Sequence, residues 1–382
     1  MQKLLSVTQK ISADHILKKA DFASAFWREV LEISEKIKTS DIHIEQVRVV
    51  GNKNHLRIRM RQSGELVTVK ESQNPDIVPI LVQRFKEIGG LDTATTAICQ
   101  DGAFYYAALG SRYRVAVAPE IAGEGIVCRV IRDGWIPQLS ELNLQPEAEK
   151  DLIQACEQDQ GIVLVTGPTG SGKSSTLQAC LMHTDRLRWK VVAVEDPVER
   201  ELEGVCHIPI TPRVGWHNAI RTAMRYDPDY ILIGEIRDRE SALLALEAAQ
   251  TGHLVFSTLH TNDAPGVVDR LIGLGVERHL IADNLYFVSA QRLEAKLCQH
   301  CRIQLPSGFY TRSKNGCENC HGGVKGLTPI LEYAINPPPD SIISFNKSHF
   351  RKNHLKQTLK NECERLSQIG ICDVERVSKY AD

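Results

Sequence analysis

The sequence predicts an α/β protein in which a small α+β domain precedes a larger domain built on a parallel sheet. Two patterns indicate this fold class. In the second half of the chain, near-continuous apolar segments of strand length alternate with helical segments, which is typical of a buried parallel sheet. In the first third, apolar and polar residues alternate over short segments, which is typical of antiparallel strands. The length of 382 residues accommodates two or three domains.

The composition disfavours a nucleic-acid-binding, a membrane-spanning or a secreted protein. The 46 lysines and arginines and the 47 aspartates and glutamates give a formal net charge of −1, so the chain has no basic surplus that would favour stable binding of nucleic acid. No apolar run is long enough to cross a membrane, and the first residues lack the apolar core of a signal peptide. We therefore expect a cytoplasmic protein.

The α+β domain is expected to occupy residues 1–135. Apolar residues at intervals of three or four predict a first helix with one apolar face, namely Phe22, Phe26, Val30, Ile33 and Ile37. From Asp41 the apolar period changes to two, which indicates strands. The later elements expected here are a helix near residues 77–88 and strands at 104–109, 113–118 and 125–131.

A break in the pattern at residues 134–137, which include Gly134 and Pro137, predicts a linker over residues 136–145. The α/β domain is expected to follow over residues 146–382. Its expected elements are helices at 146–157 and 241–251, with two further helices between them, and strands at 162–166, 191–194, 231–233 and 254–258. Parallel strands in this order align their carboxyl ends at one edge of the sheet, where ligands bind in such folds.

A phosphate-binding loop follows the first of these strands. Glycines allow backbone N–H groups to point at phosphates, a helix N-terminus adds positive potential, a lysine reaches the β- and γ-phosphates, and a hydroxyl holds Mg²⁺. The residues are Gly167, Pro168, Thr169, Gly170, Ser171, Gly172, Lys173 and Ser174, with Ser175 after them. An ordinary Gly-rich turn is the alternative, but Lys173 and Ser174 occupy the required places as well. The loop predicts ATP and Mg²⁺ as cofactors.

A carboxylate at the end of the strand at 231–233 is the candidate catalytic base. Glu235 could orient or deprotonate the water that attacks a phosphate, unless it is only a surface glutamate. Gly234 precedes it where an aspartate usually assists Mg²⁺, so metal support must come from elsewhere. The candidates after the strand at 191–194 are Glu195, Asp196 and Glu199.

Cationic groups beyond the lysine would stabilise the charge that develops on a phosphate. The candidates near these carboxylates are Arg221, Arg225 and Arg237, and those in the first domain are Arg114, Arg129 and Arg132. Each could instead be a solvated or ion-paired surface residue. Histidines His253 and His260 flank the last predicted strand, and His260 could contact a phosphate, although either could be structural.

Four of the eleven cysteines form two close pairs, Cys298 with Cys301 and Cys317 with Cys320. This spacing suits one tetrahedral Zn²⁺, and four cysteines close its coordination shell, so we expect a structural zinc in a subdomain at residues 297–326. A redox dithiol is the alternative. The other seven cysteines are scattered singly and are expected to be reduced thiols.

The chain resembles the hexameric secretion ATPase superfamily, which powers type II secretion and type IV pilus assembly. Besides the phosphate-binding loop, residues 194–199 resemble its Asp box, 227–238 its Walker B region and 249–262 its His box. Residues 40–45, Ser-Asp-Ile-His-Ile-Glu, are similar to the opening of its second N-terminal domain. The resemblance covers residues 40 to about 335.

The resemblance implies a RecA-like motor domain, a PAS-like domain before it, a homohexamer, and ATP bound between the domains with arginines reaching across. It also implies a polytopic inner-membrane platform protein as partner and peripheral association with that membrane. The cysteine pairs resemble the assembly ATPases rather than the retraction motors. Only about 39 residues precede Ser40, so we expect the extra N-terminal domain of the family to be missing or reduced. Residues 214–218 depart from the usual pattern of the family.

Two other functions remain open from the residues. A RecA-like DNA motor would have a similar ATP site, but the neutral charge and the zinc site disfavour it. A nucleotide-gated scaffold with negligible turnover is supported by Gly234, which replaces the usual metal-binding aspartate. An ATP-hydrolysing assembly motor remains the main interpretation.

Overall fold

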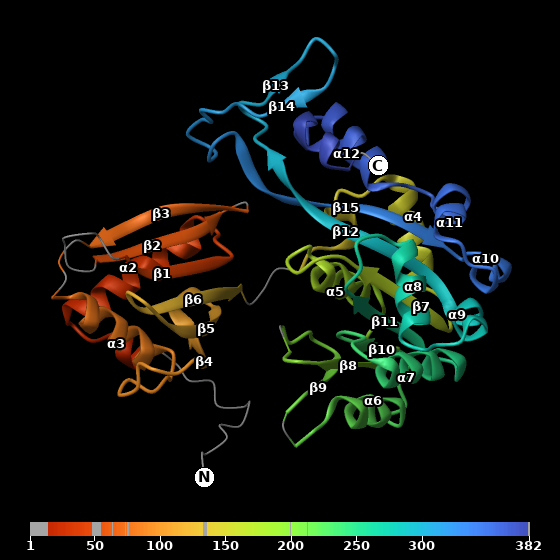
Figure 1. Cartoon of the computed structure of the whole chain (residues 1–382), viewed down its shortest axis with the longest axis horizontal. Helices are drawn as coiled ribbons and strands as arrows, with labels where there is room; N and C mark the ends of the chain where they lie inside the picture. The colour runs from red at the N-terminus through yellow and green to blue at the C-terminus, as the bar shows by residue number, and fades with distance from the viewer. Residues whose placement is uncertain are drawn as a thin grey trace. The chain divides into compact units, whose positions relative to one another are not determined.

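The structure is a computed structural model that describes residues 14–47, 55–62, 64–72, 74, 76–132, 136–198, 200–211 and 213–380. The chain divides into two compact units, residues 1–135 and 136–382 (Figure 1). Each unit has its own hydrophobic core. None of the described helices is both long and apolar enough to cross a membrane.

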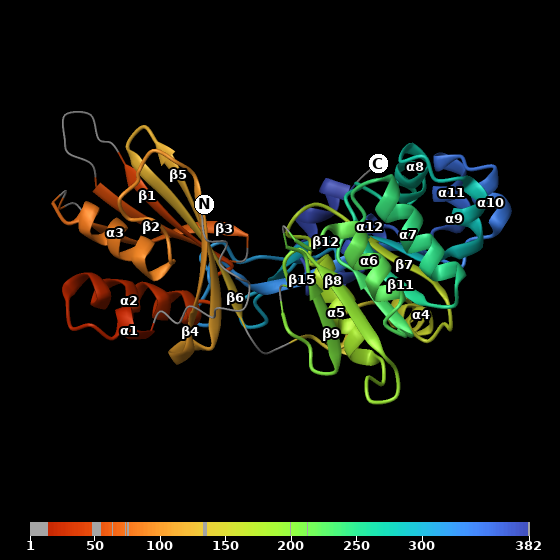
Figure 2. The same cartoon turned by 90° about the horizontal axis from the view of Figure 1, so that it is seen from below.

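The first unit is a six-stranded antiparallel sheet in the order β3-β2-β1-β6-β5-β4, with three helices (Figure 2). Alternate strand residues and the apolar faces of the helices share one core. The helices are α1 (Asp14–Leu17), α2 (Phe22–Lys36) and α3 (Val78–Ile88). The strands are β1 (Asp41–Val47), β2 (His55–Gln62), β3 (Glu65–Ser72), β4 (Gln100–Tyr106), β5 (Ser111–Glu120) and β6 (Gly123–Arg132), with the 3₁₀ turn η1 (Ala107–Leu109) after β4.

Helix α2 differs in detail from the sequence-based prediction. Phe26 and Val30 are buried as expected, but Phe22 is 59% exposed. Trp27 and Leu31 are buried instead, and the indole N–H of Trp27 donates to the Leu81 carbonyl at 2.9 Å. The apolar stripe is therefore rotated, because one partner of α2 is α3, whose position the local pattern of α2 does not contain.

The second unit is a seven-stranded sheet in the order β15-β12-β7-β11-β10-β8-β9. All neighbours are parallel except β15, which pairs antiparallel with β12. The strands are β7 (Gly161–Thr166), β8 (Val191–Glu195), β9 (Val205–Pro209), β10 (Tyr230–Ile233), β11 (Leu254–Leu259), β12 (Leu285–Leu297) and β15 (Val324–Ile335). A separate small hairpin contains β13 (Ile303–Gln304) and β14 (Tyr310–Thr311).

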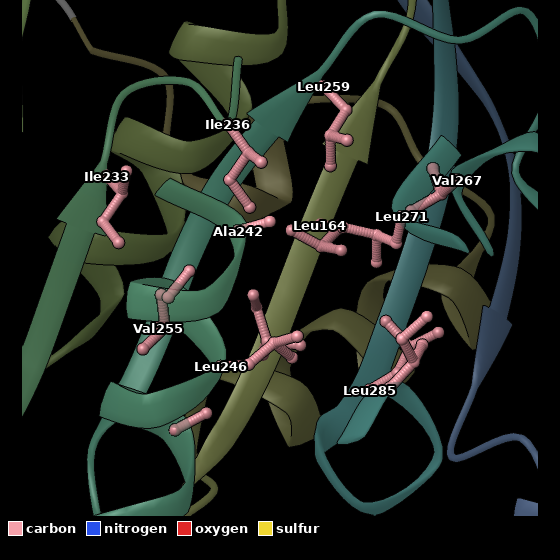
Figure 3. Packing of buried hydrophobic residues seen from close by; sticks show 14 of the residues in the cluster. Leu164, Ile233, Ile236, Ala242, Leu246, Val255, Leu259, Val267, Leu271 and Leu285 are labelled. Atoms are coloured by element: carbon pink, nitrogen blue, oxygen red, sulfur yellow. The ribbon is translucent and has the colours of Figure 1, made fainter. Parts of the chain in front are cut away.

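Helices cover both faces of this sheet because its central strands are apolar on both sides. Figure 3 shows Ala242 and Leu246 of α7 packed over Leu164 of β7 and Val255 of β11. The helices are α4 (Pro146–Cys156), α5 (Lys173–His183), α6 (Trp216–Met224), α7 (Arg239–Gln250), α8 (Pro265–Gly273), α9 (Arg278–Asn284), α10 (Pro339–Ile343), α11 (Lys347–His354) and α12 (Leu359–Gln368), with the 3₁₀ segments η2 (Leu139–Glu141) and η3 (Val374–Tyr380).

Residues 136–145, predicted as a linker, belong to the second unit. Leu139, Leu142 and Leu144 are buried in the core on the α4 and α5 side of the sheet. The composition around residues 134–137 is linker-like, but the leucines that follow have apolar neighbours to pack against. The linker prediction is therefore wrong for these ten residues.

Candidate active site

The carboxyl ends of β7, β8, β10 and β11 form one edge of the parallel sheet. At this edge lie the phosphate-binding loop after β7, Glu195 at the end of β8, Glu235 after β10 and His260 after β11. Four segments far apart in the sequence thus place their candidate residues at the edge where ligands bind in open α/β folds.

The phosphate-binding loop, residues 167–172, connects β7 to α5. Gly167, Gly170 and Gly172 have φ values of 145°, 78° and 85°, which favour glycine. A Cβ at Gly167 would lie 2.4 Å from the Gln291 carbonyl oxygen, so no side chain fits there. The loop therefore brings its backbone close to β12 and leads into the N-terminus of α5, a position that suits an anionic ligand.

Lys173 is the first residue of α5 and is 8% exposed. Its Nζ donates to the carbonyls of Gly167 and Pro168 at 2.9 and 3.1 Å, which holds the ammonium over the loop. The buried Ser171 hydroxyl has no hydrogen-bond partner among the described residues, whereas Ser174 is exposed. A phosphate group would supply an acceptor for the Ser171 hydroxyl and for Lys173, so the loop fits a phosphate.

Gln291 of β12 fixes this loop, and the sequence analysis did not identify it. Its Nε2 donates to the Ser171 carbonyl at 2.7 Å, and its Oε1 accepts from the Thr176 hydroxyl at 2.8 Å. The side chain is buried, so both bonds are shielded from water. The sequence offered no specific signal for Gln291, because β12 also contains the polar residues Ser289, Arg292, Glu294 and Lys296.

Glu195 ends β8 and is buried, with 7% of the residue exposed. Its Oε2 lies 2.9 Å from Nδ1 of His207 on β9. His207 is a second contact that the sequence analysis missed. The contact between Glu195 and His207 depends on β9 lying beside β8, which a local sequence pattern does not reveal.

Glu235 lies in a cluster with three other candidates. Arg237 donates from Nε to Glu235 and from Nη1 to Asp196, each at 3.2 Å. His260 Nε2 is 3.6 Å from the other oxygen of Glu235. Burial opposes the charge of Arg237, but the two carboxylates outweigh that effect and raise its pKa. The guanidinium also lies over the Trp216 ring at 5.1 Å.

Gly234 is in contact with the end of β8. A Cβ built on it would lie 3.3 Å from the Val194 carbonyl oxygen and 3.6 Å from the Glu195 Cα. The contact with the Val194 carbonyl oxygen is tight, so a side chain at this position would require a small shift of its neighbours.

Hydroxyl groups connect the loop that contains His260 to β7, the strand before the phosphate-binding loop. Thr166 donates to the Leu259 carbonyl at 2.8 Å and accepts from the Thr261 N–H at 2.7 Å. Thr258 donates to the Gly234 carbonyl at 2.7 Å. The loops after β7, β10 and β11 are therefore tied together by hydrogen bonds.

The remaining candidates belong to other elements of the chain. Arg221 is exposed and donates to Glu240 at 2.8 Å, and Arg225 is exposed at the end of α6. In the first unit, Arg114 and Arg129 are cross-strand neighbours on β5 and β6, and Arg129 contacts Asp41 at 3.1 Å. Glu199 and the side chain of Arg132 lie outside the described residues.

The four paired cysteines come together between β12 and β15. Their sulfur atoms lie within 4.8 Å of one another. The separations between Sγ atoms are 3.7 Å for Cys298 and Cys317, 3.6 Å for Cys301 and Cys320, and 3.7 Å for Cys317 and Cys320. Four sulfurs about 2.3 Å from a tetrahedral Zn²⁺ would be about 3.8 Å apart, so the cluster fits zinc.

Comparison with known proteins identifies the family of the chain. The family described as type II/IV secretion system protein matches residues 19–379. A protein transport protein HofB homolog of Escherichia coli is 37% identical over 89% of this chain and 77% of its own length. Type II secretion system protein E of Klebsiella pneumoniae is 38% identical over 78% of this chain. Type IV pilus assembly ATPase PilB of Pseudomonas aeruginosa is 34% identical, also over 78% of this chain. The chain spans 63% and 56% of the lengths of these last two relatives.

The fold also matches solved structures. The Legionella pneumophila ATPase DotB superposes with a TM-score of 0.70, at 21% identity, over 95% of this chain and 96% of that one. The likeness covers the described fold, and the family match covers the loops that form the candidate site. The chain belongs to the type II/IV secretion system protein family and is an ATPase of that family.

Proposed function

We propose that this chain is an ATP-hydrolysing motor that drives type IV pilus assembly or type II protein secretion. The observation that supports the proposal best is the convergence of Lys173, Glu195 and Glu235 at one edge of a parallel sheet. The names of the relatives, a pilus assembly ATPase and type II secretion proteins, indicate the kind of work.

ATP would be held by the backbone of residues 167–172, Lys173 and the following Ser174 and Ser175. Ser174 is exposed, and its hydroxyl would bind Mg²⁺. The carboxylates proposed to support this Mg²⁺ are Glu195 and Glu199. Bound Mg²⁺ would neutralise part of the phosphate charge. Lys173 would exchange the two carbonyls that it now contacts for phosphate oxygens.

Glu235 is the proposed general base. Its carboxylate would accept the proton of the attacking water, while Arg237 holds the carboxylate in position through one oxygen. His260, near the other oxygen, would contact the γ-phosphate or the attacking water. Loss of that contact after hydrolysis would alter the loops to which Thr166 and Thr261 connect it.

Further cations are proposed to come from residues outside the cluster. We propose that Arg114, Arg129, Arg221 and Arg225 stabilise phosphate charge at interfaces of a homohexamer, which would couple hydrolysis to movement. Arg114 and Arg129 already lie side by side on one sheet, which concentrates positive charge. The first unit, a six-stranded sheet with helices, would be the PAS-like domain.

The cysteine cluster would hold a structural Zn²⁺, because four thiolates leave no open coordination position. We propose that the motor works at the cytoplasmic face of the inner membrane on a polytopic platform protein. Stable binding of nucleic acid is not expected, because the formal net charge is only −1.

Measuring phosphate release by the purified chain tests this function. Glu235→Gln should lower the turnover rate by about 100- to 10,000-fold, the usual contribution of a general base, and leave ATP binding intact. Glu247→Gln, on the exposed side of α7, is the matched control and should have wild-type turnover. Full activity of the Glu235→Gln chain would refute the assignment, and a wild-type chain that binds ATP without turnover would favour the scaffold function.

A further inference from the structure

His207 and Glu195 form a largely shielded pair at the edge of the candidate active site. Their side chains are 11% and 10% exposed, and His207 Nδ1 lies 2.9 Å from Glu195 Oε2. On its other side, His207 Nε2 lies 3.0 Å from the backbone nitrogen of Leu202. The imidazole therefore connects the catalytic edge to the loop between β8 and β9.

The two contacts determine which ring nitrogen carries the proton. The Leu202 N–H can only donate, so Nε2 must be the acceptor. The proton of the neutral ring is then on Nδ1, which donates to Glu195. Leu202 is itself buried in the hydrophobic core, so the N–H that fixes this tautomer is held in position by packing.

The register of the strands explains why a histidine can reach the carboxylate. His207 pairs with Ala193 across the parallel ladder, and Glu195 lies two residues further along β8 on the same face. The small side chain of Ala193 leaves room for the ring to lean toward Glu195. Pro209, which is opposite Glu195, has no N–H that could hold the carboxylate.

We propose that His207 is a positioning residue that orients Glu195 for Mg²⁺ or for a water bound to it. This inference rests on the proposed role of Glu195 in the ATPase. The hydrogen bond occupies Oε2, whereas Oε1 accepts no hydrogen bond from the described part of the chain. Carboxylates that bind metals are usually held in this way by a neighbouring donor, whose loss costs about 10- to 100-fold in metal affinity or activity.

The test uses His207→Leu, His207→Gln and Glu195→Gln in the full chain. The readouts are the Mg²⁺ concentration at half-maximal ATPase activity, the affinity for a fluorescent ATP analogue with and without Mg²⁺, and the melting temperature. His207→Leu should raise the required Mg²⁺ concentration about 10-fold or more and weaken analogue binding only when Mg²⁺ is present. His207→Gln should recover part of the loss, because its amide can still donate to the carboxylate.

A double variant and a matched control separate positioning from folding. Adding His207→Leu to Glu195→Gln should cause no further Mg²⁺ defect, because His207 acts through Glu195. His253→Leu removes a histidine that contacts the Ala248 carbonyl at 2.8 Å before β11, so it should lower the melting temperature without changing the Mg²⁺ dependence.

Three results would overturn the inference. If His207→Leu has wild-type Mg²⁺ dependence while Glu195→Gln is defective, Glu195 keeps its proposed role but His207 does not position it. Unchanged Mg²⁺ dependence in Glu195→Gln would remove the proposed role of Glu195 and this inference with it. If His207→Leu does not fold, His207→Met, which also lacks a hydrogen-bond donor, decides: a lower melting temperature with normal Mg²⁺ dependence would make His207 merely structural.

Discussion

Gly234 separates β10 from Glu235 and packs against the end of β8. Its missing side chain leaves the space that Glu195 and the Trp216 ring border, since a Cβ would be 3.7 Å from Trp216 Cη2. The carboxylate nearest to this position in the sheet is Glu195, at the end of the neighbouring strand β8.

Replacing this glycine by aspartate should impair the enzyme. Gly234→Asp would crowd the Val194 carbonyl and Glu195, at a cost of about 1–3 kcal/mol for overpacking, and its charge would repel the Glu195 carboxylate. We expect lower phosphate release and a lower melting temperature, with a milder effect for Gly234→Ala. Faster turnover in Gly234→Asp would show that the glycine is a defect and not part of the arrangement.

Among the residues of the candidate site, those that belong to a local sequence motif could be predicted from the sequence. Those that belong to no motif could not. The phosphate-binding loop, Glu235 and the cysteine pairs have characteristic spacing, and the structure brings each set together. Gln291, His207 and Trp216 have none. Their contacts depend on β12 lying beside β7 and β9 beside β8, which a local pattern cannot reveal.

Strand β12 is the element that links the phosphate-binding loop to the end of the chain. Gln291 contacts the loop, and three residues later Glu294 is buried against η3. Arg376 Nε donates to Glu294 at 2.7 Å, Lys379 Nζ is 3.3 Å away, and the Tyr380 hydroxyl donates to the same carboxylate. This strand therefore contacts both η3 and the phosphate-binding loop.

The stability that Glu294 contributes should depend on pH. Burial alone would raise the pKa of Glu294, but Arg376, Tyr380 and Lys379 outweigh it and hold the pKa below its ordinary value of 4.5. A lowered pKa in the folded state stabilises the protein above about pH 4.5, and that contribution is lost as the pH falls through the folded value.

Glu294→Gln should therefore lower the free energy of unfolding by about 1–3 kcal/mol at pH 7, because three donors lose a charged acceptor. Denaturant titrations at pH 7 and at the lowest pH where the chain stays folded measure the difference. The gap to wild type should shrink at low pH, whereas the exposed control Glu247→Gln should show no gap at either pH. A gap that is independent of pH would contradict the assigned charge state.

The segment between β12 and β15 should depend on its metal. We expect about one Zn²⁺ per chain by metal analysis, and Cys298→Ser or Cys317→Ser should reduce that content and the melting temperature. Cys99→Ser, an exposed cysteine of the first unit, should leave the zinc content unchanged. A zinc ratio near zero in carefully purified wild-type protein would rule out the site.

At the scale of the whole molecule, the sequence predicted two domains and their fold classes. Some elements that it did not predict are short, whereas the strands β12 and β15 have 13 and 12 residues. Strand β9 is half-buried over its whole length, so it has no clear apolar pattern. Strand β15 joins the sheet only through its antiparallel pairing with β12. Helices α10, α11 and α12 contain ten residues or fewer, so their periodicity is weak.

Titration calorimetry of MgATP into the Glu235→Gln chain tests the central claim most directly, because this variant should bind ATP without consuming it. The account predicts binding near one ATP per chain, abolished when Lys173→Ala is added, because the loop would lose its phosphate-binding ammonium. If folded Glu235→Gln protein takes up no nucleotide in the presence of Mg²⁺, or if Lys173→Ala binds as tightly, the proposed site at the end of β7 is wrong.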